Sequence, residues 1–318
     1  MTQGPEPTLG ESGEFAVIER LTVGRSRPAA VSVGPGDDAA VVDAPDGRVA
    51  VSTDMLVEGR HFRLDWSTAY DVGRKAIAQN AADIEAMGAS VTAFVVAVGA
   101  PPTTAVARMT ELGDGMWAEA EACGASIVGG DLVASPQWVI SVAVLGDLGG
   151  RPPVLRSGAR AGAVIAVAGE LGRSAAGLTL WSNGIDGFAD IRNRHLVPRP
   201  PYGQGRLAAE AGALAMTDVS DGLLADLGQL ATASGVTMDL DGEALRTDIE
   251  AVTEVAEAAG ADPWAWVLGG GEDHALLACF PLGPPPGWRV IGAVRSGAAE
   301  VLLDGAAWPG SPGWQSFD

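Results

Sequence analysis

Short apolar runs alternate with amphipathic stretches along the first half of the chain. Apolar runs bounded by glycine, proline or aspartate are typical of strands, and an apolar stripe with a period near 3.6 is typical of a helix. The pattern predicts strands at residues 39–43, 49–53, 91–98 and 138–145. It predicts helices at 14–21, 71–89 and about 104–122. In the middle helix, Ile77, Ala81 and Ile84 form the stripe, and Gly88 provides the stop.

The second half begins after a change of composition at G-D-L-G-G-R-P-P, residues 146–153. We therefore expect two domains, residues 1–150 and 151–318. The second is predicted to hold a strand at 163–168, a helix at 174–182, a loop at 192–201, a helix striped by Leu223, Leu224, Leu227 and Leu230, and a strand at 275–280. Because strands and helices do not alternate in a regular βαβ order, the expected fold class is α+β rather than a doubly wound sheet.

The composition agrees with a globular protein of two domains. The chain has 318 residues, 47% of them hydrophobic, which is enough to fill two cores. Its apolar runs are much shorter than the roughly 20 residues of a membrane span. The first residues contain no basic stretch followed by an apolar one, so we expect a cytoplasmic protein. Neither Cys123 nor Cys279 stands in a C-x-x-C or Cys/His ligand spacing, so both are expected to be buried free thiols.

The charge balance restricts the partners. Lys and Arg number 20 against 40 Asp and Glu, a formal net charge of −20. Such a field repels nucleic acid and anionic lipid, so we expect neither as a partner. It also repels phosphate substrates. An enzyme of this charge that acts on phosphates must therefore neutralise them locally with metal ions or a few arginines.

The first half contains two oxygen-rich segments. G-P-G-D-D-A-A (34–40) is a glycine turn that ends in Asp38, and Ser52, Thr53 and Asp54 end a predicted strand. Hydroxyl and carboxylate oxygens are the ligands that Mg²⁺ prefers. Either segment alone is better explained as an Asp-rich turn or a strand cap, because such turns are common. Together they favour a magnesium site.

Two further aspartates of the first half are weaker candidates. Asp83 lies in the middle of an Ala-rich helix, where aspartate has poor propensity and could simply face water. Asp131 ends the segment I-V-G-G-D (127–131), which we interpret as a turn whose glycines let the backbone approach a phosphate. Neither segment is specific alone.

The second half has a denser motif, T-D-V-S-D-G, residues 217–222. The leucine stripe predicts that the next helix starts at Ser220 or Asp221, with Asp218 before it at a strand end. Helix capping would explain Ser220 and Asp221, but it does not explain Asp218. A glycine-rich turn, G-G-G-E-D (269–273), follows later and precedes a predicted strand. No histidine stands beside a Ser or Cys nucleophile signature, so a hydrolase triad is not expected.

Taken in order, these motifs resemble those of the thiamine-monophosphate kinase family over nearly the whole chain. The matching segments are G-P-G-D-D-A-A, V-S-T-D-M-L-V-E-G-R-H-F, K-A-I-A-Q-N-A-A-D-I-E-A-M-G-A, I-V-G-G-D, V-L-R-S-G-A-R-A-G, S-A-A-G-L, R-H-L-V-P-R-P, D-V-S-D-G-L and G-G-G-E-D. The resemblance implies a two-domain fold like that of aminoimidazole ribonucleotide synthetase. Its N-terminal mixed sheet with helices would bind ATP and metal and form a homodimer. Its C-terminal α/β sandwich-like domain would complete the substrate site.

The resemblance also implies the reaction, which is Mg²⁺-dependent transfer of the ATP γ-phosphoryl group to thiamine monophosphate. The implied ligands of several Mg²⁺ ions are Asp38, Ser52, Thr53, Asp54, Asp83, Asp131, Asp218 and Asp221. The implied ATP contacts are Gly130, Asp131, Arg156 and Ser220, and those to thiamine monophosphate are His61, Glu272 and Phe317. No side chain would act as an acid or base, because the metals and Arg156 stabilise the charge.

The sequence departs from the family pattern at three places. Leu132 and Val133 follow Asp131 where the family usually has two threonines, Gly113 replaces a frequent aromatic residue, and Phe317 stands where many members have tyrosine. Two alternatives remain open. One is another ATP-dependent enzyme of the same superfamily with a different acceptor. The other is a non-catalytic, acidic metal-binding protein.

Overall fold

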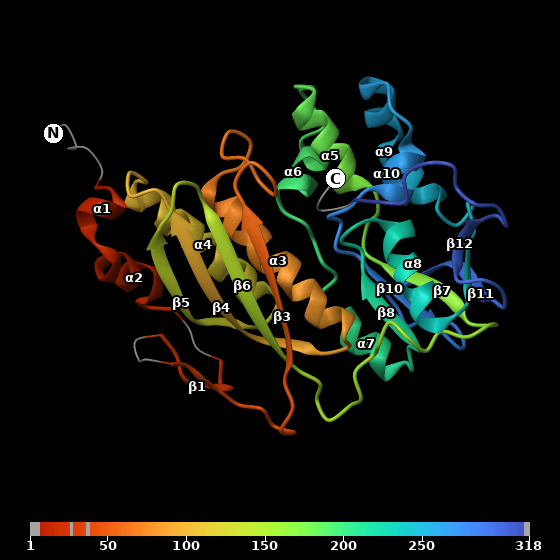
Figure 1. Ribbon diagram of the computed structural model, residues 1–318, viewed down its shortest axis with the longest axis horizontal. Coiled ribbons are helices and arrows are strands. Elements are labelled where there is room, and N and C mark those ends of the chain that lie inside the picture. The colour runs from red at the N-terminus through yellow and green to blue at the C-terminus, as the bar shows by residue number, and fades with distance from the viewer. Residues whose placement is uncertain (1–6, 26–27, 36–38, 315–318) are drawn as a thin grey trace. The chain divides into compact units, whose positions relative to one another are not determined.

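The computed structural model describes residues 7–25, 28–35 and 39–314, and the chain forms two compact units (Figure 1). Unit 1 comprises Met1–Ala81 and Val91–Asp147, and unit 2 comprises Ala82–Ser90 and Leu148–Asp318. Helix α3 (Ala69–Ala86) contributes to both units. Its last turn belongs to unit 2, where Ala86 packs into an apolar cluster with Val154. Within the described residues, no helix is both long and apolar enough to cross a bilayer.

Unit 1 is built on a four-stranded mixed sheet in the order β3-β6-β4-β5. β3 (Ala50–Val57) pairs antiparallel with β6 (Val139–Asp147), whereas β4 (Ser90–Ala100) pairs parallel with β5 (Ser126–Ala134). Helices α3 and α4 (Val106–Ala122) lie behind this sheet (Figure 1). The remaining elements are α1 (Leu9–Ser12), α2 (Glu14–Thr22), β1 (Val31–Val33) and β2 (Val41–Val42).

The two faces of this sheet differ in exposure because side chains alternate along a strand. Ile140, Val142 and Val144 of β6 are fully buried on the face that the helices cover. On the opposite face, Val51 and Met55 of β3 are 70% and 54% exposed. The described residues thus leave much of one apolar sheet face open to solvent.

Unit 2 contains a six-stranded mixed sheet in the order β12-β9-β11-β7-β10-β8. Its strands are β7 (Val164–Ala168), β8 (Ala215–Asp218), β9 (Thr237–Leu240), β10 (Leu276–Phe280), β11 (Arg289–Arg295) and β12 (Glu300–Leu303). Only the β12–β9 pair is parallel among the described strand pairs of this sheet. Its helices are α5 (Arg173–Ser182), α6 (Ala189–Leu196), α7 (Gln204–Glu210), α8 (Leu223–Ser234), α9 (Arg246–Ala259) and α10 (Pro263–Gly269).

Both faces of this second sheet are buried, which explains the unbroken apolar runs of the sequence. Along β10, Leu277 and Cys279 face a large core that includes the leucines of α8. The alternate residues Leu276, Ala278 and Phe280 face a second, smaller core. A strand that is buried on both faces needs apolar residues at consecutive positions rather than at every second one.

The predicted α+β class is confirmed, but some local predictions are wrong. Part of the predicted loop 192–201 is helical, because α6 packs closely against α5: a Cβ at Gly177 would lie 2.5 Å from the carbonyl oxygen of Ile191. The strand predicted at 39–43 is reduced to Val41–Val42. The predicted turn 127–131 lies entirely within β5.

Candidate functional site

Three segments that are distant in sequence meet in unit 2. The backbone N–H groups of Glu272 and His274 donate to the carbonyl oxygens of Ser220 and Val219, both at 2.8 Å. The N–H of Trp314 donates to the carbonyl oxygen of Asp221 at 2.9 Å. Backbone hydrogen bonds therefore join the acidic loop after β8, the glycine-rich turn before β10 and the C-terminal segment. This arrangement brings the neighbourhoods of Asp218, Asp221 and Glu272 together.

Glycine is required where these backbones approach each other. A Cβ at Gly271 would lie 2.6 Å from the carbonyl oxygen of Ser220, and one at Gly313 would lie 2.6 Å from that of Asp221. Real side chains do not tolerate such distances, so any larger residue would push the segments apart. The glycines of this turn thus allow close backbone packing.

Asp218 ends β8, as predicted, and it is 3% exposed. Its Oδ2 atom lies 3.1 Å from Nδ1 of His274, which is also buried. Burial works to lower the pKa of His274, but the hydrogen bond to Asp218 and the charges of Asp218, Glu272 and Asp83 outweigh it and raise the pKa. The Asp218 carboxylate thus favours a hydrogen on the Nδ1 atom of His274 that faces it. Asp83, half-buried at the end of α3, lies within electrostatic reach of the same histidine.

Ser220 and Asp221 precede helix α8 and do not start it, in contrast to the prediction. The N-cap residue is Gly222, and Asp226 in the first turn of α8 binds the loop that precedes the helix. The Oδ2 atom of Asp226 accepts the N–H groups of Asp221 and Gly222, each at 3.0 Å. Burial, followed by the charges of Asp218 and Asp221, raises the pKa of Asp226 to about 7. Capping therefore does not explain the side chains of Ser220 and Asp221.

Glu272 lies in the glycine-rich turn with a left-handed φ of 62°, and its side chain is 31% exposed. The next residue, Asp273, fixes the turn to α5, because its carboxylate accepts the N–H groups of Gly172 at 2.5 Å and Ser174 at 2.9 Å. Burial raises the pKa of Asp273 to about 7, although these two hydrogen bonds work to lower it. The backbone around Glu272 is thus held from both sides.

In unit 1, Asp54 lies on the edge strand β3 beside helix α3. Its Oδ2 accepts from Nε2 of Gln79 at 3.1 Å, and its backbone N–H donates to Oδ1 of Asn80 at 3.0 Å. Asn80 is fully buried and anchors its own amide on the carbonyl of Ala76. Edge-strand N–H groups lack a ladder partner, so Asn80 satisfies one of them and positions Asp54.

Ser52, Thr53 and Asp54 do not form one set of side-chain ligands. Strand alternation places Ser52 and Asp54 on the helix side, and Thr53 on the exposed side of the sheet. The hydroxyl of Thr53 donates to the carbonyl oxygen of Val142 at 2.8 Å.

Asp131 lies on the exposed side of β5, opposite Ala97 in the β4–β5 ladder. Its Oδ1 accepts the N–H of Leu132 at 2.9 Å. The preceding Gly130 is needed for strand pairing, because a Cβ there would lie 2.1 Å from the carbonyl oxygen of Val96. Leu132 is buried, whereas Val133 is 53% exposed. Leu132, one of the two positions where the family usually has threonine, is therefore a core position.

His61 is half-buried next to β3, and its Nδ1 accepts the N–H of Val57 at 3.0 Å. The hydrogen of a neutral ring is therefore on Nε2, which can donate to an anion.

Gly113, where the family often has an aromatic residue, packs against α2. A Cβ at this position would lie 2.5 Å from a side-chain carbon of Leu21. A larger side chain there requires the side chain of Leu21 to move.

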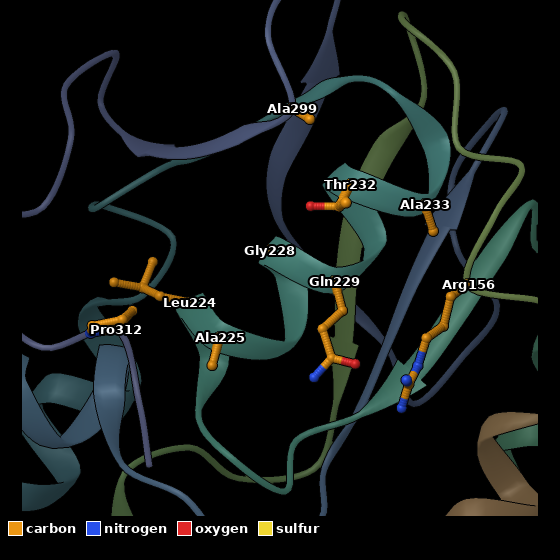
Figure 2. Close-up of a pocket in the computed structure, with 9 residues that line it drawn as sticks. All are labelled: Arg156, Leu224, Ala225, Gly228, Gln229, Thr232, Ala233, Ala299 and Pro312. Carbon is orange, nitrogen blue, oxygen red and sulfur yellow. The ribbon is translucent and has the colours of Figure 1, made fainter. Parts of the chain in front are cut away.

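Arg156 is exposed and lines a cavity of about 630 Å³ on the outer side of α8. Gln229 and Thr232 contribute the other polar side chains, and Leu224 and Pro312 lie toward the opposite end (Figure 2). Asp38 and Phe317 lie outside the described residues. Among the residues that are described, no three His, Cys, Asp or Glu side chains are grouped so as to hold a metal by themselves.

The sequence patterns do not predict Asn80, Asp226 and His274 as residues that position the acidic side chains or their loops. One signal was available for Asp226, which lies three residues after Leu223 and one before Leu227, on the apolar face of its helix. A charged residue on such a face is buried and needs partners. His274 offered no comparable signal, because its partner Asp218 is distant in sequence.

Comparison with known proteins identifies the family. Residues 36–148 match the model "AIR synthase related protein, N-terminal domain", and residues 160–271 match "AIR synthase related protein, C-terminal domain". The chain is 66% identical over 312 residues to a thiamine-monophosphate kinase of Mycobacterium tuberculosis, covering 98% of this chain and 93% of that protein. It is 44% identical to one of Corynebacterium glutamicum, covering 98% and 95%.

A solved structure described as AaThiL complexed with AMPPCP and TMP matches the fold with a TM-score of 0.78 and 30% identity, over 100% of both chains. The matches extend over both units, in the order that the sequence motifs predicted. The chain therefore belongs to the thiamine-monophosphate kinase family, within the AIR synthase related superfamily.

Proposed function

We propose that this protein transfers the γ-phosphoryl group of ATP to thiamine monophosphate, giving thiamine diphosphate and ADP. The identity of 66% over nearly the whole length supports this activity over that of a sister enzyme with another acceptor. It also disfavours a protein that only binds metal. Because ATP is the co-substrate, we place the reaction in the cytoplasm.

The observation that carries this proposal is the backbone-bonded cluster in unit 2. It presents the acidic loop that contains Asp218 and Asp221 next to the turn that contains Glu272. Carboxylate oxygens of the loop suit hard cations that bind phosphates. A separate carboxylate suits the cationic thiazolium ring of the acceptor.

The donor set fits Mg²⁺. This ion usually keeps several waters and binds one or two carboxylates together with substrate phosphates, so it does not require a cage of three protein ligands. The residues proposed to hold Mg²⁺ on the helix side of β3 and in unit 2 are Ser52, Asp54, Asp83, Asp218 and Asp221, together with Asp38, which lies outside the described residues. Thr53 and Asp131 lie on the exposed side of their sheet, and the hydroxyl of Thr53 is bonded to the carbonyl of Val142, so these two residues would contact an ion apart from Asp54. Bound Mg²⁺ would supply the positive charge that this acidic chain lacks and neutralise the charge on the transferring phosphoryl group.

The chemistry needs no protein base. The attacking atom is a phosphate oxygen that is already anionic at neutral pH, so catalysis depends on positioning and charge stabilisation. For ATP we propose contacts from Gly130, Asp131, Arg156 and Ser220. Arg156 is exposed and lines an open cavity, so its guanidinium is accessible to an anion.

For thiamine monophosphate we propose contacts from His61, Glu272 and Phe317. The Nε2–H of His61 can donate to the substrate phosphate, and the partly exposed carboxylate of Glu272 can face the cationic ring. The N-terminal domain, residues 1–150, would bind ATP and metal, and residues 151–318 would complete the substrate site.

We also propose a homodimer that is formed through the open sheet face of unit 1. Val51, Met55, Val95 and Val133 expose 70%, 54%, 39% and 53% of their surface. Exposed apolar groups on one face favour a protein interface. A second copy of the chain can cover this face by two-fold symmetry, in which each copy presents the same surface.

The activity is tested by incubating the protein with ATP, Mg²⁺ and thiamine monophosphate and measuring thiamine diphosphate by chromatography. Asp218→Asn should lower kcat/KM by about 100-fold or more, the usual scale for one lost charge contact in a transition state. The control Asp65→Asn alters an exposed ion pair with Arg63 and should retain the activity of the wild type. If the wild type forms no thiamine diphosphate, the proposed reaction is wrong.

A further inference from the structure

A buried histidine lies directly behind Glu272. His195 is on helix α6 and is 7% exposed. Its Nδ1 atom lies 3.4 Å from Oε2 of Glu272 and 3.3 Å from Oγ of Ser174. Ser174 belongs to the first turn of α5. Two side chains, from α5 and from the turn before β10, thus converge on one ring nitrogen of a third side chain on α6.

The chemistry of this contact defines where the hydrogen is. A ring nitrogen that faces a carboxylate must carry a hydrogen, because a lone pair there would repel the negative oxygen. We assign the ring hydrogen to Nδ1 of His195, where it is shared between Oε2 of Glu272 at 3.4 Å and Oγ of Ser174 at 3.3 Å. An N–H that points at a carboxylate limits the rotation of the glutamate side chain and favours one orientation.

The positions of the two partners are set independently of each other. The backbone of Glu272 is held by its N–H bond to Ser220 and by the bonds of Asp273 to α5. His195 is held because α6 packs tightly on α5, where a Cβ at Gly177 would lie 3.0 Å from the Cβ of His195. Two anchored groups that meet at 3.4 Å form a pre-organised contact.

We infer that His195, together with Ser174, is a positioning residue that orients the carboxylate of Glu272 toward the cationic ring of thiamine monophosphate. This inference rests on the role proposed for Glu272. It predicts that His195 affects the binding of the thiamine substrate and not that of ATP. Ser174 limits the position of the imidazole and has the smaller effect of the two.

The test is steady-state kinetics of three variants, with the KM of each substrate measured separately. His195→Ala and His195→Gln should raise the KM for thiamine monophosphate roughly 10-fold, the scale of one hydrogen bond to a charged group. The KM for ATP should change less than about 2-fold. His195→Asn places an N–H near the position of Nδ1 and should raise the KM less than His195→Gln, which mimics Nε2.

A double variant separates positioning from general damage. If His195 acts through Glu272, His195→Ala combined with Glu272→Gln should be no worse than Glu272→Gln alone. Asn193→Ala on the exposed side of α6 serves as the matched control and should leave both KM values unchanged. Thermal unfolding of each variant shows whether it is folded. If His195→Ala does not fold, His195→Asn and His195→Gln still provide the test.

The outcomes distinguish the separate proposals. Absence of thiamine diphosphate formation by the wild type contradicts the reaction itself. An unchanged KM for thiamine monophosphate in Glu272→Gln contradicts the role of Glu272 and this inference with it. If Glu272→Gln raises this KM but His195→Ala and His195→Gln do not, or if they raise both KM values equally, only the positioning role of His195 is wrong.

Discussion

The buried carboxylate of Asp273 should make stability depend on pH. Its pKa of about 7 in the folded protein is above the ordinary value of 3.8, so the folded state binds an additional proton between these values. Stability is therefore fully present below about pH 4 and decreases as pH rises toward 7. Relative to Asp273→Asn, the free energy of unfolding of the wild type should fall by up to about 4 kcal/mol across this range, as measured by urea unfolding. If the difference in the free energy of unfolding between the wild type and Asp273→Asn does not change with pH, this prediction is wrong.

The two thiols should differ in reactivity. Cys279 is fully buried in β10, and burial raises its pKa to about 12, whereas Cys123 is half-buried at the end of α4. The thiolate is the reactive form, so at pH 8 a disulfide reagent such as DTNB should label one thiol in the native protein and two after unfolding. Cys123→Ser should remove the native reaction. Rapid labelling of both thiols in the folded protein would contradict this burial.

At the level of elements, adjacent glycines of β5 provide a matched pair. A Cβ at Gly130 would lie 2.1 Å from the carbonyl oxygen of Val96, whereas one at Gly129 would meet no described atom of another residue within 4 Å. Gly130→Ala should therefore destabilise the protein by at least about 2 kcal/mol, because β4 and β5 must separate. Gly129→Ala should stay within about 1 kcal/mol of the wild type. Thermal or urea unfolding measures the stability of both variants. An equal loss of stability in the two would contradict the close pairing of β4 and β5.

Most elements could be predicted from the sequence, because each has its own apolar period. The strands at 91–98, 138–145, 163–168 and 275–280 and the helix at 174–182 are all found, with shifts at their ends. The local sequence does not predict helix α6, because the helix is stabilised by packing against α5 at Gly177 and not by its own pattern. The glycines of β5 predict a turn, since only the neighbouring strand shows that they are needed for close pairing.

For the whole molecule, the open sheet face leads to a prediction about assembly. The protein should sediment at twice the 32.2 kDa of the chain. Met55→Glu should shift it toward the monomer, because a charge would be buried in the proposed interface. Leu282→Glu changes a residue in unit 2 that is 80% exposed and should leave the assembly unchanged. A monomeric wild type would contradict the proposed dimer.

By itself, the sequence determined the α+β class, most elements and, through its ordered motifs, the family. These properties are local or compositional, so they can be predicted without coordinates. Only the tertiary structure decided that His274 supports Asp218, that Asp226 closes the loop of Asp221 and that His195 lies behind Glu272. Each of these pairs except Asp221 and Asp226 joins residues from distant segments, and side-chain contacts of this kind depend on packing that no local pattern records.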